Sequence, residues 1–343
     1  MFFHEKWGGS STEEAEAMMD ALPVLSVVMP VRNGAIYLEI AVRSILEQTF
    51  ADFEFIIIDD GSSDQTPMLL SSLAKNDERI RLLRTSGEGI VVALNAGIRA
   101  ARGALIARMD ADDIAFPERF AMQVEALRAM PQLVALGSSA ITIDARGNET
   151  GRMTVTTEAR AAMAELMCRN SLLHPTMMFG RVAALELGLY RPACIYAEDY
   201  DLWLRLSERG EMANLGQPLL RFRLHSLQTS KTRRLTQRAA TAFARQMAIR
   251  RRNGEPEGID MNLPLHTALG MFLRQRAESG IAMERPESKD IEIILREVHH
   301  ELDAMLIKKL ISLMKSGLTR WENLQFRFRM AFARRGMANA RPK

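Results

Sequence analysis

The sequence predicts an α/β fold with a mainly parallel central sheet and helices on both of its faces. Short apolar runs rich in β-branched residues indicate buried strands, and segments with apolar residues at helical spacing separate them. Between Leu25 and Ala107 the two kinds of segment alternate, from strand to helix and back to strand. Such alternation is typical of parallel strands that are covered by helices on both sides.

Each element of this first half is predicted from its local pattern. Residues 25–29 form an apolar run that Pro30 is expected to stop, and Asn33-Gly34 is a turn signal before a helix that extends to Gln48. The next expected elements, in order, are a strand at 53–58, a helix around 67–70, a strand at 80–83, a helix at 90–102 and a strand at 104–107.

The second half continues with further strand signals and ends in a change of composition. Its expected elements are strands at 134–137, 141–143, 174–179 and 218–224, with helices at 158–169 and from 197 onward. From about Lys231 the strand signals stop, Arg becomes frequent and helical stretches follow. We therefore place a domain boundary near residue 230. Residues 1–22 are expected to form a flexible leader, 23–230 the main domain and 231–343 a basic, helical C-terminal extension.

The composition argues against several classes of protein. Hydrophobic residues make up 47% of the 343 positions, which is enough for a substantial core. The net charge of +3 gives no general case for nucleic-acid binding. The two cysteines, Cys168 and Cys194, lack metal-ligand spacing, and a reducing compartment is the simpler interpretation. Neither a signal peptide nor an apolar run of about 18 residues is visible, so we expect a cytoplasmic protein without a transmembrane helix.

Three aspartates lie together directly after the strand at 104–107. The segment Met109-Asp110-Ala111-Asp112-Asp113 brings together three carboxylates that repel one another unless water or a cation screens them. Hard divalent cations such as Mg²⁺ or Mn²⁺ prefer oxygen ligands and are often shared with substrate phosphates. The segment therefore predicts a metal and diphosphate site. The alternative, which the segment alone does not exclude, is a solvated turn whose aspartates cap the following helix.

Polar residues also follow the first and second strands. Arg32-Asn33 follows the first strand, and Asp59-Asp60 follows the second. Because the carboxyl ends of parallel strands share one edge of a sheet, these loops and the aspartates after residue 107 are expected to meet there. Three polar clusters on one rim are difficult to explain as three unrelated helix caps. We therefore expect a nucleotide pocket at this edge.

A set of short motifs, each weak by itself, is specific when taken in order. The motifs are SVVMPVRNG at 26–34, SILEQTF at 44–50, IIDDGSSD at 57–64, ALNAG at 93–97, MDADD at 109–113, HPTMM at 174–178, EDYDLW at 198–203 and RLHS at 223–226. Through them the stretch from Leu25 to Ser230 resembles a family 2 glycosyltransferase with the GT-A fold. The resemblance does not extend to the C-terminal part, and it makes residues 23–230 the catalytic domain.

This resemblance implies a nucleotide-diphosphosugar donor, usually a uridine one, a divalent cation (Mn²⁺ or Mg²⁺), and inversion at the anomeric carbon. It assigns nucleotide binding to Pro30, Arg32, Asn33, Asp60 and Asp110, with Asp60 pairing with the uracil ring. It assigns the metal-bridged diphosphate to Asp110, Asp112 and His225. One departure from the family pattern is Val31, which replaces a common aromatic residue and so removes a stacking partner for the base.

By the same resemblance, Asp199 is the general base and Glu198 supports it or orients the acceptor. Sugar transfer requires the acceptor hydroxyl to lose a proton as it attacks the anomeric carbon, and one carboxylate opposite the leaving group is sufficient for this step. The alternative is that Asp199 is a first-turn carboxylate that stabilises the N-terminus of a helix. In that position the helix dipole would lower its pKa and weaken it as a base.

Four further residues keep two interpretations each. Asp113 is expected to cap a helix or to lie behind the metal ligands, and Asp60 has an alternative role in an Asx-turn. His174 precedes a proline, so its backbone is extended, and it is either a structural loop residue or part of the site. His225 is either a ligand or a bystander, because imidazole suits Mn²⁺ less strictly than it suits Zn²⁺.

The C-terminal segment has a basic, amphipathic pattern. Trp321, Leu324, Phe328 and Phe332 fall near one helical face, and arginines occupy much of the remainder. This pattern suits a helix on an anionic membrane surface, with contact through residues 317–336. The alternative is packing on the catalytic domain or on another subunit. The expected location is therefore cytoplasmic, with or without peripheral contact to the inner face of the membrane.

The sequence thus predicts a metal-dependent inverting glycosyltransferase that acts on a glycan or lipid-linked acceptor, without a nucleic-acid partner. A sugar-phosphate nucleotidyltransferase is the alternative among enzymes. It would require a glycine-rich loop with Arg and Lys after the first strand, and residues 30–34 do not provide one. A non-catalytic sugar-nucleotide-binding protein is the other alternative, and the presence of Asp110, Asp112 and Asp199 argues against it.

Overall fold

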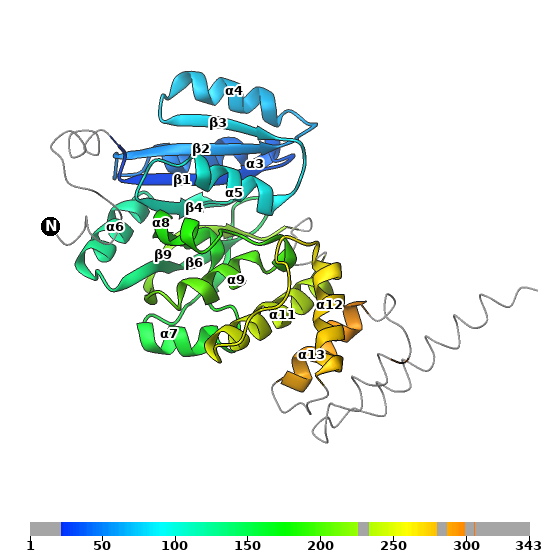
Figure 1. Cartoon of the computed structure of the whole chain (residues 1–343). Coiled ribbons are helices and arrows are strands. Elements are labelled where there is room, and N and C mark those ends of the chain that lie inside the picture. The colour runs from blue at the N-terminus through cyan, green and yellow to red at the C-terminus, as the bar shows by residue number, and fades with distance from the viewer. Residues whose placement is uncertain (1–21, 226–232, 280–286, 299–304, 306–343) are drawn as a thin grey trace, which may run out of the picture. The chain divides into compact units, whose positions relative to one another are not determined.

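The chain divides into two compact units, residues 1–265 and 266–343, in the computed structural model (Figure 1). The residues that the structure describes are 22–225, 233–279, 287–298 and 305. The first unit contains the sheet and every residue expected in the site. It also contains helix α11 (Arg234–Arg252), so the domain boundary near residue 230 stays a prediction from composition.

The first four strands form the parallel part of the sheet, in the spatial order β3-β2-β1-β4. These strands are β1 (Leu25–Val31), β2 (Phe53–Asp60), β3 (Ile80–Thr85) and β4 (Leu105–Arg108). The helices between them are α3 (Ala35–Leu46), α4 (Thr66–Asn76) and α5 (Ile90–Ala100). Because β2, β1 and β4 are neighbours and run in the same direction, their carboxyl ends lie at one edge.

The second half of the sheet is mixed, so the sheet is less uniformly parallel than the sequence suggested. It continues from β4 in the order β8-β6-β9-β5, with β7 beside β6, and among these pairs β6 and β9 are parallel. The strands are β5 (Ile114–Ala115), β6 (Leu133–Ile143), β7 (Glu149–Met153), β8 (Met178–Gly180) and β9 (Glu211–Arg223). The helices are α6 (Arg119–Ala129), α7 (Ala159–Leu166), α8 (Arg181–Glu186) and α9 (Glu198–Leu206), with 3₁₀ turns η1 (His174–Thr176) and η2 (Pro192–Cys194).

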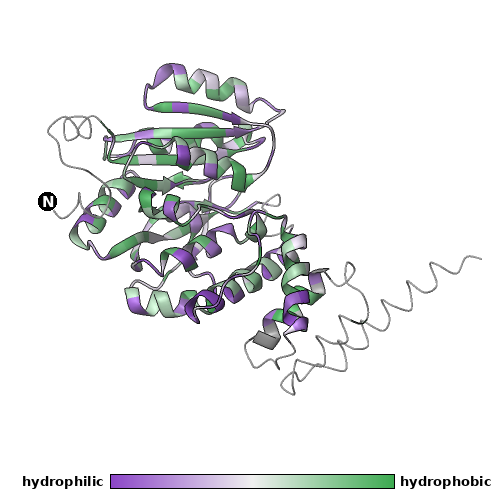
Figure 2. Ribbon diagram, in the orientation of Figure 1, coloured by the Kyte–Doolittle hydropathy of each residue, from purple (hydrophilic) through white to green (hydrophobic). Residues whose placement is uncertain are grey.

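Helices cover both faces of the parallel strands, as the sequence predicts. On one face, Met29 of β1 belongs to the same buried cluster as Leu38 of α3 and Phe120 of α6. On the other face α5 approaches so closely that a Cβ on Gly97 would lie 2.6 Å from Val28 Cγ1. Figure 2 shows the strands mainly in hydrophobic colours and many hydrophilic residues on the helices. The strands therefore lie in the core of the protein, and the polar residues that follow each strand lie at its carboxyl end.

Strand β1 continues through the half-buried Pro30, which the sequence analysis expected to end it. Val28 O accepts a hydrogen bond from Met109 N on the β4 side of the strand. The backbone N–H and C=O groups of a strand point to the same side at every second residue. The N–H that Pro30 lacks would therefore face β4, as Val28 O does. The pairing of β4 with β1 ends at Val28 and Arg108, so no ladder hydrogen bond is lost at Pro30.

Two other expected elements differ in extent. The strands expected at 134–137 and 141–143 are one continuous strand, β6, because it pairs along its length with β9. The segment expected as a strand at 174–179 begins with the 3₁₀ turn η1, and β8 starts only at Met178.

The described part of the C-terminal extension is helical, as predicted. Besides α11 it contains α12 (Leu265–Glu278) and α13 (Glu287–Val298). Within the described residues, no helix combines the length and the apolar character that crossing a membrane requires. The leader up to residue 21 and the segment 317–336 lie outside the described residues, so membrane contact stays a prediction.

Candidate active site

The loops that follow β1, β2 and β3 are held together by hydrogen bonds. Asn33 adopts a left-handed conformation with φ 53°, which Asn tolerates better than most residues. Its backbone N–H donates to Ser62 Oγ at 2.8 Å, and its Oδ1 accepts from Ser63 N at 2.8 Å. Arg32 is exposed, and its Nη1 lies 3.5 Å from Gly87 O. The predicted nucleotide residues of the first loop therefore lie against the second and third loops.

Asp60 is the last residue of β2, and its carboxylate contacts the third loop. It accepts from Thr85 Oγ1 at 2.6 Å and from the backbone N–H groups of 88–89 at 3.0 and 2.9 Å. The neighbouring Asp59 contacts the loop that follows β2, because its Oδ1 accepts from Ser62 N, three positions on, at 2.9 Å. A carboxylate has about four acceptor positions. Asp60 therefore retains one position beyond the three in use.

The acidic turn, residues 110–113, directly follows β4. Oxygen atoms of Asp110, Asp112 and Asp113 all lie within 4.8 Å of one another. Asp113 is almost fully buried, and its Oδ1 accepts from Arg223 N at 2.8 Å. Its Oδ2 is buried and has no hydrogen-bond partner among the described residues. Burial, together with the charges of Asp110 and Asp112, raises the pKa of Asp113 well above its usual value. An orphaned carboxylate oxygen beside two other carboxylates fits a divalent cation.

Three buried arginines surround the acidic turn, and the sequence analysis assigned no role to any of them. Arg108 Nη1 forms an ion pair with Asp110 Oδ2, so the cluster has a neighbouring cation that the sequence argument did not foresee. Arg223 Nε donates to Asp112 O at 2.8 Å, and Arg119 Nη2 donates to Arg108 O at 2.7 Å. For Arg108 and Arg223 the available signal was an arginine at the last position of a strand, β4 or β9.

His225 meets the acidic turn from the end of β9. Its Nε2 lies 2.7 Å from Asp112 Oδ2. Its ring centroid lies 5.8 Å from that of Tyr37 on α3, and the Arg223 guanidinium lies 4.3 Å from the centroid of the same Tyr37 ring. The three residues predicted to bind metal, Asp110, Asp112 and His225, therefore come together.

The first turn of α9 carries the pair that was expected to include the base. Asp199 Oδ2 accepts from Asn170 Nδ2 at 2.8 Å, and its Oδ1 accepts from Tyr200 N at 2.7 Å. Burial raises the pKa of Asp199, and the bond from Asn170 opposes this rise. Glu198 is buried, its Oε2 has no hydrogen-bond partner among the described residues, and burial with the charge of Asp199 raises its pKa to about 7. The pKa of both carboxyl groups is therefore raised, which is the opposite of the lowering expected from a helix dipole alone.

Arg108 couples the acidic turn to Asp199 electrostatically. It is 4% exposed, and its charge opposes the rise that burial causes in the pKa of both Asp110 and Asp199. His174 lies in the same neighbourhood, because burial and the charge of Arg108 lower its pKa well below the usual value. His174 Nε2 lies 2.8 Å from Tyr190 OH. His174 is therefore a half-buried histidine that is neutral at neutral pH and lies beside Tyr190.

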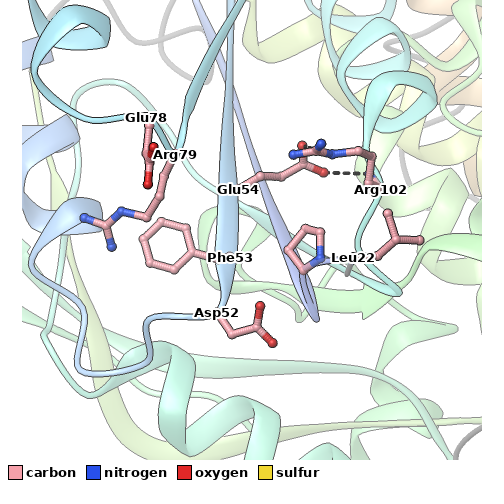
Figure 3. A pocket seen from close by; sticks show the side chains of 8 residues that line it. Leu22, Asp52, Phe53, Glu54, Glu78, Arg79 and Arg102 are labelled. Carbon is pink, nitrogen blue, oxygen red and sulfur yellow. Dashed lines mark hydrogen bonds and ion pairs between the residues drawn. The ribbon is translucent and has the colours of Figure 1, made fainter. Parts of the chain in front are cut away.

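A pocket of about 250 Å³ lies at the opposite end of the strands (Figure 3). Phe53 and Glu54, at the start of β2, line it together with Arg79 and Arg102. Glu54 accepts from Arg102 N at 2.6 Å, and the Arg79 guanidinium lies 4.6 Å from the centroid of the Phe53 ring. Successive strand residues rise by about 3.3 Å, so roughly 20 Å separate this pocket from Asp60. Glu54, Arg79 and Arg102 are already engaged in ion pairs, and the pocket is not part of the site.

Comparison with known proteins identifies the family. The profile of Glycosyl transferase family 2 matches residues 26–188. An uncharacterized glycosyltransferase of Haemophilus influenzae is 31% identical over 230 residues, which cover 62% of this chain and 69% of that protein. The O-antigen biosynthesis glycosyltransferase WbnJ of Escherichia coli is 31% identical over 215 residues, which cover 62% of this chain and 84% of that protein. The chain belongs to glycosyl transferase family 2.

A solved structure shows the fold of this glycosyltransferase. S. aureus TarS, residues 1–349, in complex with UDP-GlcNAc, superposes with a TM-score of 0.56 at 14% identity, covering 84% of this chain and 83% of that chain. At this identity the likeness shows the GT-A fold alone. The predicted fold, family and enzyme class are confirmed. The profile ends at residue 188, so the roles expected for Asp199 and His225 stay predictions.

Proposed function

We propose that this glycosyltransferase moves a sugar from a UDP-sugar to a hydroxyl group of a glycan or lipid-linked acceptor, with inversion at the anomeric carbon. The acidic turn carries the proposal. Three carboxylates gather within 4.8 Å after β4, and one of their buried oxygens lacks a hydrogen-bond partner among the described residues. The family membership supports sugar transfer as the reaction.

The nucleotide would bind along the loops after β1 and β2. The remaining acceptor position of Asp60 suits the N3–H group of uracil, because that group is a hydrogen-bond donor. Pro30, Arg32 and Asn33 would lie beside the base and ribose, and Asp110 beside the ribose. TarS was solved with UDP-GlcNAc on the same fold, which supports a uridine donor.

Asp110, Asp112 and His225 would hold Mn²⁺ or Mg²⁺, with Asp113 behind them. When bound, the cation would neutralise the negative charge that develops on the departing diphosphate. The chain's own residues keep these groups in position. Arg108 pairs with the Asp110 carboxylate, and Arg223 N donates to Asp113 Oδ1 at 2.8 Å.

Asp199 would take the proton of the acceptor hydroxyl on its carboxylate. The acceptor oxygen forms a bond to the anomeric carbon while the bond from that carbon to the diphosphate oxygen breaks, and the electron pair leaves with the diphosphate. One displacement from the opposite face inverts the anomeric centre. Burial raises the pKa of Asp199 and makes it a stronger base, and Asn170 and Arg108 limit that rise.

Release of UDP from a panel of UDP-sugars with Mn²⁺ tests the proposal. The wild type should release UDP from at least one sugar, and Asp112→Ala should abolish release. Asp199→Asn should reduce the rate by about 10²–10⁴-fold. It should keep the thermal stabilisation by UDP and Mn²⁺, because ligand binding to the folded state raises the melting temperature. Asp52→Asn, an exposed acid at the opposite end of β2, is the matched control.

Two outcomes would contradict the proposal. One is that no nucleotide diphosphate or nucleotide sugar raises the melting temperature. The other is that the protein releases pyrophosphate from a nucleoside triphosphate and a sugar phosphate, which would indicate a nucleotidyltransferase. The structure disfavours that alternative, because β1 ends at Val31 and α3 begins at Ala35. The loop between them is too short to surround a triphosphate.

A further inference from the structure

Two buried polar side chains, those of Arg119 and Gln123, lie behind the acidic turn. They have no role in the chemistry described above. Arg119 and Gln123 lie four positions apart on α6, so they share one face of the helix, and both are 0% exposed. Phe120, Val124 and Leu127 are the other buried residues of this helix. A helix face that packs on a core normally carries apolar side chains. Two polar residues here therefore require a specific explanation.

Arg119 contacts the backbone at the end of β4. Its Nη2 donates to Arg108 O at 2.7 Å, its Nη1 lies 3.5 Å from Met109 Sδ, and its Nε donates to Gln123 Oε1 at 3.2 Å. Arg108 is the last residue of β4, and Asp110 follows two positions later. Arg119 therefore fixes the point at which the chain leaves the sheet and enters the acidic turn.

Gln123 continues this series of hydrogen bonds to the second half of the sheet. Its Nε2 donates to Leu136 O at 3.0 Å and to Thr176 O at 2.8 Å, while its Oε1 accepts from Arg119. Thr176 is the last residue of η1, and its Oγ1 accepts from Ser138 N at 3.1 Å. The amide of Gln123 thus joins the end of β4, through Arg119, to the turn η1.

The 3₁₀ turn η1 packs against α9, the helix that carries the proposed base, Asp199. The ring of His174 in η1 lies edge to face with Trp203 of α9, with centroids 5.8 Å apart. Trp203 is fully buried, so α9 cannot shift easily at this contact. Asp199 occupies the first turn of the same helix. A continuous series of contacts therefore leads from Arg108 O to the element that carries Asp199.

Packing alone does not account for an arginine at position 119. No carboxylate among the described residues lies within ion-pair distance of it. Burial and the nearby charge of Arg108 lower its pKa to about 9, and the charge of Asp113 opposes this only in part. It therefore stays charged at neutral pH. A buried charge without an ionic partner is destabilising, and an apolar side chain of similar volume would pack at lower cost. The hydrogen bond to Arg108 O gives the arginine a role that such a side chain lacks.

We propose that Arg119 and Gln123 are positioning residues that fix the acidic turn relative to Asp199. The inference rests on the proposed function, in which the donor binds at the acidic turn and the base acts from α9. Displacement requires the acceptor oxygen, the anomeric carbon and the leaving oxygen to be aligned, and a misplacement of about 1 Å can cost about 100-fold in rate. Loss of the hydrogen bonds made by Arg119 and Gln123 would change the position of the acidic turn relative to Asp199. The residues within the acidic turn, and those around Asp199, would keep their own arrangement.

Two variants of similar volume test the inference, Arg119→Met and Gln123→Met. We expect each to lower kcat for UDP release from the UDP-sugar that the wild type uses by about 10–100-fold. The Kd for UDP with Mn²⁺, measured by calorimetry, should change by less than about threefold, because the residues of the donor site keep their positions relative to one another. Arg119→Lys keeps a charge and one donor for Arg108 O, and it should recover part of the rate. Arg128→Met, an exposed arginine of the same helix, is the control.

A purely structural role would lower the melting temperature and leave kcat per folded molecule unchanged, and that result would overturn the inference. Equal losses in kcat and in UDP affinity would also overturn it, because the effect would then lie in the donor site alone. Gln123→Met keeps the bond from Arg119 to Arg108 O, so it decides the matter if Arg119→Met does not fold. A wild type that releases UDP from no sugar would overturn the proposed function itself, before any variant is compared.

Discussion

Asp112 Oδ2 lies 2.7 Å from His225 Nε2, although 113 positions separate the two residues along the chain. Asp112 belongs to the turn after β4, and His225 follows β9, and these strands are not neighbours in the sheet. Arg223 spans the gap, because its N–H donates to Asp113 Oδ1 and its Nε donates to Asp112 O, both at 2.8 Å. The acidic turn is therefore completed by the last strand of the sheet.

Replacing His225 by Ala should weaken the binding of UDP in the presence of Mn²⁺ and leave metal-free binding of UDP unchanged. His225 contacts Asp112, so the change removes either a metal ligand or the residue that orients one. Losses of this kind cost about 10–100-fold in metal affinity. Calorimetric titration of UDP with and without Mn²⁺ measures the effect. His266→Ala, at a half-buried histidine of α12, serves as control, and equal UDP affinities of the wild type and His225→Ala with Mn²⁺ would contradict the prediction.

Replacing Glu198 by Gln should stabilise the fold more at pH 8 than at pH 5. The pKa of Glu198 is raised from 4.5 to about 7, first by burial and then by the charge of Asp199. Between these values the folded state binds the proton more tightly than the unfolded state, so stability falls as pH rises. Above pH 7 the full cost, on the order of 3 kcal/mol, is present, and Gln removes it.

Urea unfolding at the two pH values measures the difference between the wild type and Glu198→Gln. Glu186→Gln, an exposed glutamate on α8, should show nearly equal effects at both values and provides the control. If Glu198→Gln loses stability at pH 8 relative to the wild type, Glu198 has a favourable buried partner when it is ionised, and the prediction is wrong.

The parallel half of the sheet and its polar edge could be predicted from the sequence because each depends on local pattern. The apolar runs that begin at Leu25 and Phe53 are buried along their whole length, so their composition indicates their structure directly. The meeting of the loops follows from the shared direction of β2, β1 and β4, which the alternation of strands and helices implies. Family motifs then supplied the candidate roles.

The partners of the charged residues could not be predicted in the same way. Arg108 lies in a strand segment and Arg119 in a helix segment, and local pattern alone places such charged residues at the surface. Their importance arises from burial, which depends on how α6 packs beneath β4. The donors to Asp60 come from the loop after β3, so they depend on β3 lying beside β2. These contacts belong to the tertiary structure and leave little local signal.

Replacing Asn170 by Leu should move the acidic limb of the pH profile of UDP release to higher pH. Asn170 Nδ2 donates to Asp199 Oδ2 at 2.8 Å, and this bond lowers the pKa of Asp199 against the larger effect of burial. Without the bond the carboxylate keeps its proton to higher pH, so less of the base is ionised in acidic buffer. At alkaline pH the rate should return towards that of the wild type, because Tyr200 N still holds Oδ1.

Asn170→Asp extends the same test. A second carboxylate beside Asp199 repels its negative charge, so the acidic limb should move further than in Asn170→Leu. The profile of kcat/KM reports the pKa of the free enzyme's essential base, and measurements from pH 5 to pH 9 would order the wild type, the Leu variant and the Asp variant by that pKa. An equal loss of rate at every pH would instead show that Asn170 acts on the geometry of Asp199 and not on its ionisation. The expected graded displacement cannot arise from misplacement alone, since a misplaced base loses rate without changing the pH at which it titrates.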